Sequence, residues 1–315
     1  MQIQIATSGG RPTWLARVIA AFAVAVAVAF AAALPASAQT LDRVRAAGRI
    51  KLGYLVDAPP FTVRNNAGAA EGYAAALCQR IADSLKAQPG LGSVAVEWVP
   101  VTIDNRVGQV QQGNVDLLCT PLTATVERRQ DVAFSIPVFP GGVRAVVRND
   151  AIAALREALE ASRQDGRVVW RGSPAATVLG EKSFGVVAGT TTERWLADRL
   201  LSFQIASKVV PVSDYRTAVQ QLLDRKVDVV FGDRALVLGA MDSSAQESLT
   251  ILPRLLTHEP LSFALARGDD DFRLLVDRAL SDAYASAAFS ELYSTWCGEF
   301  DDNTRAFFQW NTLTQ

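Results

Sequence analysis

The 315-residue chain has one histidine, three cysteines and no excess of either charge. Its 31 basic and 32 acidic residues give a formal net charge of -1, which leaves no basic surplus for displacing counterions from a nucleic acid. The single histidine, His258, has no partner for a Cys–His or Ser–His–Asp site, and the cysteine spacing matches no zinc pattern. The sequence thus argues against nucleic-acid binding, a structural metal and nucleophilic catalysis, and it indicates no cofactor.

Long apolar runs are also absent after the first forty residues. The run at 18–34 follows two arginines and precedes the small residues Ala36-Ser37-Ala38, an arrangement that predicts a cleaved signal peptide. The expected mature chain begins at Gln39 and lies in the periplasm. The alternative is an uncleaved membrane anchor, because 17 apolar residues are at the short end of what spans a bilayer.

Strand and helix patterns alternate along the rest of the chain. Short apolar runs bounded by turn residues predict strands at 49–56, 93–101, 115–119, 143–148, 183–189, 208–212, 227–233 and 260–268. Helical spacing of apolar residues predicts helices at 71–87, 105–113, 151–162, 191–203 and 215–226, with further amphipathic helices over 270–300. Residues 163–182 are irregular and receive no assignment. This alternation predicts an α/β protein with mostly parallel sheets flanked by helices.

The strand–helix layout occurs twice, which predicts two lobes that the chain traverses twice. Proline and glycine at "PVFPGG" and "EPLSFA" mark the crossings between them. The expected signal peptide is 1–38. The first lobe is expected at 39–137 and 264–315, and the second lobe at 143–258. The hinge crossings between them are 138–142 and 259–263.

Two adjacent arginines, Arg128 and Arg129, stand in "TATVERRQDVAFS" after a threonine-rich turn. Either both lie on a solvated helix face, or one binds an anion. A planar guanidinium meets a carboxylate through two parallel hydrogen bonds, a geometry that lysine cannot supply. The two residues are about 100° apart on a helix, so only one would face a ligand.

Six motifs occur in order: "GRIKLGYLVDAPPF", "EGYAAALC", "NVDLLCTPLTATVERRQDVAFS", "VVAGTTTERWL", "VDVVFGDRAL" and "EPLSFALARGDDDF". Together they resemble periplasmic solute-binding proteins for polar amino acids (family 3), close to the glutamate/aspartate and glutamine types. The resemblance spans nearly all of the mature chain. It implies a type II two-lobe fold with a two-strand hinge. It also implies a monomer that is not an enzyme, closes around an amino acid or related anion, and serves an ABC permease in the inner membrane.

The resemblance also implies ligand-binding residues in the first lobe. Arg128 matches the arginine that binds the ligand's carboxylate, whereas Arg129 is expected to face solvent. Thr123 matches a position whose hydroxyl touches the ligand, and the Pro121 carbonyl is available to the ammonium group. Relatives usually have Gly or Ser near Pro121. Thr125 either contacts the ligand or caps the following helix.

In the second lobe, Gly189, Thr190 and Thr191 stand where a strand meets a helix. Free N–H groups and the positive helix end there suit an anion, and the resemblance implies that this turn closes over the α-carboxylate; an ordinary N-cap is the alternative. Asp233 follows an apolar strand and matches the aspartate for the ligand's ammonium, or else caps a helix. Tyr215 matches a residue near the ligand.

The side-chain pocket departs from the acidic-amino-acid type. Relatives that bind acidic amino acids carry an arginine near Leu55, and Leu55, Ala58 and Ile103 instead predict an apolar lining on that side. The departure predicts poor binding of glutamate and aspartate.

Two other functions fit the same resemblance. The first is a periplasmic enzyme of the cyclohexadienyl-dehydratase type, for which Glu193 and Asp233 are the only candidate acids or bases. The second is a sensing domain that docks on a membrane receptor.

The cysteines offer one pairing. Cys78 lies in the first predicted helix and Cys119 ends a predicted strand, so helix-on-sheet packing could bring their Cβ atoms within disulfide reach. Relatives of the acidic-amino-acid type have cysteines at both places, and the resemblance therefore implies a Cys78–Cys119 disulfide with Cys297 unpaired. The alternative is two buried thiols.

Overall fold

The computed structural model describes residues 40–161 and 173–314. The predicted signal peptide, its cleavage point and the mature terminus at Gln39 lie outside these ranges. No helix within them combines the length and the apolar character that a membrane span needs.

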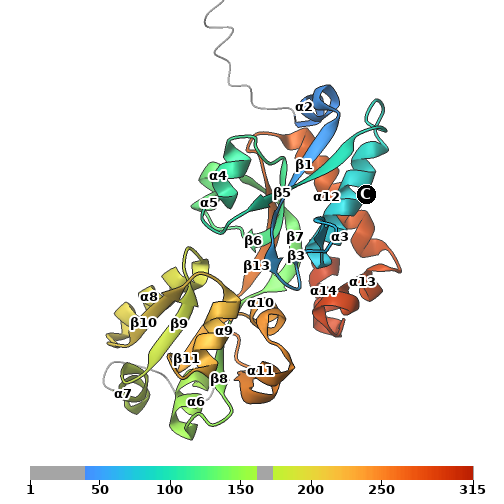
Figure 1. Ribbon diagram of the computed structural model, residues 1–315. Coiled ribbons are helices and arrows are strands. Elements are labelled where there is room, and N and C mark those ends of the chain that lie inside the picture. The colour runs from blue at the N-terminus through green and yellow to red at the C-terminus, as the bar shows by residue number, and fades with distance from the viewer. Residues whose placement is uncertain (1–39, 162–172, 315) are drawn as a thin grey trace, which may run out of the picture. The chain divides into compact units, whose positions relative to one another are not determined.

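The first sheet has five strands and includes β1, the first strand of the described chain (Figure 1). Its order is β5 (Ala95–Val101), β1 (Arg49–Leu55), β6 (Leu117–Thr123), β13 (Glu259–Leu265) and β7 (Ala133–Gly141). β1 runs parallel to β5 and β6, whereas β13 runs antiparallel to β6 and β7. A small antiparallel sheet follows β1 and contains β2 (Asp57–Ala58), β3 (Thr62–Arg64) and β4 (Ala70–Glu71).

The second sheet also has five strands, in the order β10 (Lys208–Val212), β9 (Ser183–Val187), β11 (Val229–Asp233), β8 (Val143–Arg148) and β12 (Leu249–Ile251). β9 runs parallel to β10 and β11, and β8 runs antiparallel to β11 and β12. Each sheet therefore has a parallel part completed by antiparallel strands from elsewhere in the chain.

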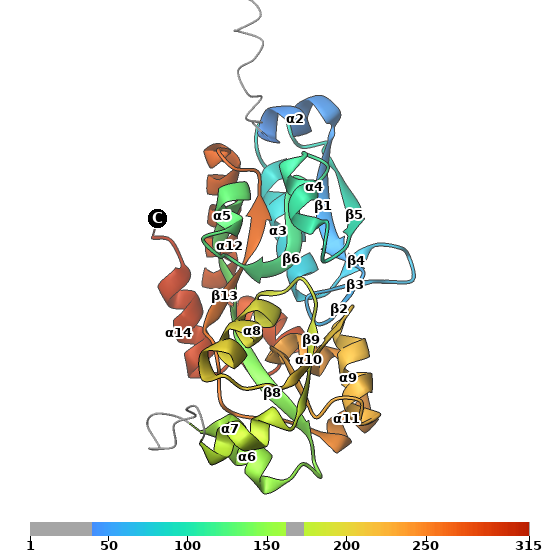
Figure 2. The same cartoon turned by 90° about the vertical axis from the view of Figure 1, so that its left-hand side faces the viewer.

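Thirteen helices occur in the described ranges. Those associated with the first sheet are α2 (Thr40–Ala47), α3 (Tyr73–Lys86), α4 (Arg106–Gln111), α5 (Arg128–Asp131), α12 (Asp270–Ala285), α13 (Phe289–Cys297) and α14 (Asp302–Asn311). The others are α6 (Ala153–Glu160), α7 (Pro174–Gly180), α8 (Thr191–Phe203), α9 (Tyr215–Leu223), α10 (Arg234–Ala240) and α11 (Ser243–Ser248). Both views show α3 beside α12 and α6 beside α7 (Figures 1 and 2).

The predicted fold class is confirmed: the chain is α/β, with two mixed five-stranded sheets flanked by helices. The predicted strands at 49–56, 143–148 and 208–212 and the helix at 191–203 correspond closely to β1, β8, β10 and α8. The sequence analysis assigned no element where α7, α10, α11, β12 and α14 lie. For α7, the unassigned stretch did contain a start signal, because the Ser173 side chain caps the helix and Pro174 is its first residue.

The chain passes between the sheets through Gly142, which separates β7 from β8. A Cβ atom at this position would lie 2.2 Å from the Thr257 carbonyl oxygen, so the backbones of the two crossing segments approach too closely for a side chain. The Gly142 N–H donates to Asp233 Oδ2 at 2.8 Å. The crossing is thereby tied to the end of β11.

Cys78 of α3 and Cys119 of β6 are joined by a disulfide bond, with 6.0 Å between their Cα atoms. Both residues are fully buried in the core between α3 and the first sheet. Cys297, near the end of α13, carries a free thiol, and burial raises its pKa. The bond therefore ties one helix across the sheet to the strand that leads to Thr123.

Candidate ligand-binding site

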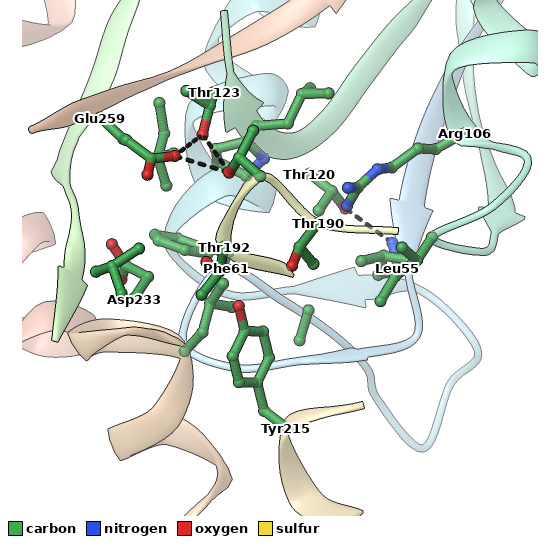
Figure 3. Close-up of a pocket in the computed structure, with 18 of the residues that line it drawn as sticks. Leu55, Phe61, Arg106, Thr120, Thr123, Thr190, Thr192, Tyr215, Asp233 and Glu259 are labelled. Carbon is green, nitrogen blue, oxygen red and sulfur yellow. Dashed lines mark hydrogen bonds between the residues drawn. The ribbon is translucent and has the colours of Figure 1, made fainter. Parts of the chain in front are cut away.

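A pocket lies where the carboxyl ends of strands from both five-stranded sheets meet (Figure 3). Leu55 and Thr123 end β1 and β6 of the first sheet, and Asp233 ends β11 of the second. Ligands of open α/β folds bind at this edge, because helices and loops leave a crevice beyond the strand ends. The pocket is therefore the candidate site.

Seven of the eight ligand-binding residues predicted from the sequence line this pocket. They are Pro121, Thr123, Arg128, Thr190, Thr191, Tyr215 and Asp233. The eighth, Gly189, is not among the lining residues, and its N–H donates to Glu193 Oε2 at 2.9 Å. Their roles in binding remain predictions.

Arg128 is the first residue of α5, immediately after the turn that follows β6. Its Nη1 donates to the Thr123 carbonyl at 2.9 Å, which fixes the guanidinium and leaves its other donors available. Burial, followed by repulsion from Arg106 and Arg194, lowers the pKa of Arg128 to about 10. Arg128 is thus a partly desolvated cation among other cations.

The neighbours of Arg128 on the turn take different roles. The Thr125 hydroxyl accepts the Arg128 backbone N–H at 3.1 Å, and Thr125 is not among the lining residues, so the structure gives it the capping role. Arg129 is exposed, with its guanidinium carbon 5.5 Å from the centroid of the Phe134 ring. Only one of the two adjacent arginines faces the pocket.

Arg106, the first residue of α4, is a pocket residue that the sequence analysis missed. It is only 8% exposed, and its side chain extends into the pocket in Figure 3. Within the described part of the chain, no hydrogen bond or ion pair ends on its guanidinium, and burial lowers its pKa. An arginine next to apolar helix positions in "NRVGQVQQG" gave no distinctive signal.

The presence of Arg106 removes the premise of one prediction. Leu55, Ala58 and Ile103 do line the pocket, as expected. The pocket nevertheless contains a second cation besides Arg128, because Arg106 reaches it from α4 and not from the loop after β1. The argument that acidic amino acids bind poorly therefore no longer holds.

The second sheet supplies polar groups mainly through helix N-caps. Thr190, Asp214 and Asp233 cap α8, α9 and α10, accepting backbone N–H groups at 3.3, 2.7 and 2.8 Å, and all three line the pocket. The N-cap alternative for Asp233 is thus present in the structure. Its carboxyl also accepts from Gly142, and burial raises its pKa.

Tyr215 lies at the start of α9 with its ring against the backbone of β11. A Cβ at Gly232 would be 2.6 Å from the Tyr215 ring, so the glycine makes room for the tyrosine. Burial raises the pKa of Tyr215, which keeps the phenol neutral at physiological pH. The ring provides a flat apolar wall with one polar end.

Glu259, the first residue of β13, is the second pocket residue that the sequence analysis missed. Thr123 and Thr191 donate their hydroxyls to its Oε2 at 2.8 and 2.7 Å (Figure 3). Thr257 donates to its Oε1 at 2.7 Å. The sequence analysis treated "EPLSFA" only as a crossing. Nothing in one sequence distinguishes a glutamate that faces the pocket from one that faces solvent.

The pocket therefore combines two guanidinium groups with four carboxylates. Asp57 is paired with Arg216, Asp214 and Asp233 cap helices, and Glu259 accepts from threonine hydroxyls. Such a charge pattern complements a small zwitterion, whose carboxylate and ammonium groups need opposite partners. The described residues contain no group of His, Cys, Asp and Glu side chains arranged to hold a metal ion.

The chain is similar in sequence or fold to several known proteins. It is 24% identical over 259 residues to an L-glutamate/L-aspartate-binding protein of Pseudomonas aeruginosa, covering 82% of this chain and 79% of that protein. A cyclohexadienyl dehydratase of the same species is 24% identical over 278 residues, covering 86% and 91%. An ancestral arginine-binding protein bound to arginine superposes with a TM-score of 0.63 at 25% identity, covering 80% and 99%.

The model of one protein family matches residues 50–299, which is most of the chain and includes both sheets. The two-sheet architecture and the pocket at the strand ends agree with that match. The chain belongs to the bacterial extracellular solute-binding proteins, family 3.

Proposed function

We propose that the protein binds a small acidic amino acid in this pocket and delivers it to an ABC importer. The observation that carries the proposal is the placement of Arg106 and Arg128 in one pocket with Asp233 and Glu259. Glutamate and aspartate each have two carboxylates and one ammonium, so every charge would find an opposite partner. A buried arginine without a partner is costly, and an anion would offset that cost.

The proposal gives the two arginines and the turn before α8 separate roles. Arg128 binds the α-carboxylate through paired hydrogen bonds, assisted by the positive amino-terminal end of α8 at Thr190 and Thr191. Arg106 binds the side-chain carboxylate, beside the apolar wall formed by Leu55. Gly189 contributes the turn before α8, since its N–H is bonded to Glu193.

We place the hinge at the two crossings, 138–142 and 259–263, with the first lobe at 39–137 and 264–315 and the second at 143–258. Ligand contacts from both lobes favour the closed state, because they exist together only when the lobes meet. Export through residues 1–38 would bring a monomeric mature chain to the periplasm, where it would meet the permease.

A thermal-shift screen of the twenty common amino acids, followed by calorimetry, tests the proposal, since stabilisation grows with ligand concentration over Kd. We expect L-glutamate and L-aspartate to bind and L-lysine and L-arginine not to bind. Arg106→Ala should weaken L-glutamate binding more than L-glutamine binding. Preferential binding of L-lysine would overturn the acidic assignment, and the absence of any amino-acid ligand would overturn the function.

A dehydratase is the second candidate, favoured by the acidic side chains in the pocket and by the similarity to the cyclohexadienyl dehydratase. Of the acids named from the sequence, Asp233 lines the pocket and Glu193 does not, whereas Glu259 adds another. Incubation of the purified protein with a cyclohexadienyl substrate distinguishes the two functions. We expect the wild-type protein to show no turnover. Turnover by wild type that is lost in Glu259→Gln would instead establish an enzyme.

A further inference from the structure

Three hydroxyl groups point their protons at Glu259. Thr123 and Thr191 donate to Oε2, and Thr257 donates to Oε1, at distances between 2.7 and 2.8 Å. An ionised carboxylate has no proton to give, so each threonine must be the donor. Thr123 comes from β6 and Thr191 from α8, so one carboxylate organises hydroxyls from elements of both sheets.

This arrangement determines what the two pocket threonines can offer to a ligand. A hydroxyl has one proton and two lone pairs, and the protons of Thr123 and Thr191 are already committed to Glu259. Their lone pairs remain as acceptors. A carboxylate placed against these oxygens would meet only acceptors, whereas an ammonium group, with three donors and no acceptor, would find partners.

Asp233 is differently engaged. One of its carboxyl oxygens accepts from Ala235 and the other from Gly142, both backbone N–H groups at 2.8 Å. These bonds fix the start of α10 and the crossing at Gly142. Asp233 is therefore held on both oxygens by backbone N–H groups, which have no lone pair to offer a ligand. The partners of Glu259 are threonine hydroxyls, which can also accept.

We propose that Glu259 is the residue that selects an α-ammonium group, by binding it directly and by holding Thr123 and Thr191 as acceptors. This inference rests on the proposed function, because it takes an amino acid as the ligand of the same pocket. It changes the expected role of Thr191, which becomes an ammonium partner instead of a carboxylate partner. The carboxylate is left to Arg128 and the start of α8.

The test compares an amino acid with its analogue that lacks the amino group. The pairs are L-glutamate with glutarate, L-aspartate with succinate, and L-glutamine with glutaramate. The pair used is the one whose amino acid binds the wild-type protein most tightly. Affinities are measured by calorimetry at pH 7.5. Wild type should prefer the amino acid. Glu259→Gln should reduce that preference by at least about tenfold, because a hydrogen bond to a charged group is lost and the hydroxyls become free to donate.

Two further variants keep the result interpretable. Glu127→Gln removes a negative charge that is paired with Arg194 outside the pocket lining, and it should keep the wild-type preference. Thr191→Val removes one acceptor and leaves the glutamate in place, so it should reduce the preference even where Glu259→Gln fails to fold.

The outcomes separate the two proposals. If wild type binds none of the three amino acids, this ligand class is wrong and the inference falls with it. If wild type binds, but Glu259→Gln or Thr191→Val weakens both members of the pair equally, Glu259 is not the ammonium partner and the proposed function stands.

Discussion

The two sides of the pocket present their polar groups in different ways. On the first-sheet side, no helix cap of the described chain lines the pocket, and the charged groups include the guanidinium groups of Arg106 and Arg128 and the Glu259 carboxylate. On the second-sheet side, α8, α9 and α10 each begin with a capping side chain, and all three caps line the pocket.

Because of this difference, substitutions on the two sides should affect ligand affinity and folding stability differently. A cap residue bonds to the backbone of its own helix, so replacing it costs folding free energy as well as any ligand contact. A guanidinium that extends into a pocket contributes little to folding and costs free energy through its own desolvation. Substitution of a pocket arginine should therefore affect affinity alone, and substitution of a pocket cap should affect both affinity and stability.

Arg128→Ala tests the first-sheet side most directly and should have the largest effect. We expect a loss of about 2–5 kcal/mol of binding free energy, because the ligand's carboxylate would lose its buried charged partner. The free energy of unfolding without ligand should change little, because the side chain makes one hydrogen bond, to the Thr123 carbonyl. Calorimetry and urea unfolding measure the two quantities. A large stability loss with unchanged affinity would remove the contrast between the sides.

The Cys78–Cys119 bond is a stabilising feature of the first-sheet side. Replacing both cysteines with alanine should lower the free energy of unfolding by about 3–4 kcal/mol on the chain-entropy model, since the bond closes a loop across 41 positions. Urea unfolding of the purified mature protein measures the change. Peptide mapping under non-reducing conditions should recover Cys78 linked to Cys119, and a link from either residue to Cys297 would contradict the pairing.

Thr190→Ala examines a cap on the second-sheet side. We expect a loss of about 1 kcal/mol in the free energy of unfolding, because Thr190 caps α8 by accepting the Glu193 N–H, together with weaker ligand binding. Asp242→Ala is the matched control: Asp242 caps α11 and is not among the pocket-lining residues. It should lose similar stability and keep its affinity. Equal affinity losses in both variants would mean that caps act on binding only through general destabilisation.

Local pattern was sufficient for most of the fold. Apolar runs bounded by turn residues predicted β1, β8 and β10, and the 3.6-residue period predicted α3 and α8, because the apolar residues of these segments are visible in the local sequence. Short elements such as β12 and α11 carry too few residues for a period to be recognised. Their positions are set by contacts with strands and helices distant in the sequence.

The residues of the candidate site likewise differ in how far the sequence alone could identify them. Arg128, Thr190 and Asp233 stand in motifs that carry the family resemblance, which is why they were predicted, and they line the pocket. Arg106 and Glu259 were missed because their significance depends on which face of a short helix and which end of a crossing strand meet the pocket. That information lies in the tertiary arrangement, since a charged residue at a helix start is ordinarily solvated.

Arg129→Ala should have the smallest effect and provides the control for Arg128. Arg129 is exposed and lies over the Phe134 ring, with its guanidinium carbon 5.5 Å from the centroid. Its removal should cost about 0.5–1 kcal/mol of stability, the usual size of an exposed cation–π contact, and should leave the Kd unchanged. Calorimetry on the two single variants, made in the same background, measures the difference between adjacent arginines. An affinity loss in Arg129→Ala equal to that in Arg128→Ala would mean that net positive charge, and not one oriented guanidinium, attracts the ligand.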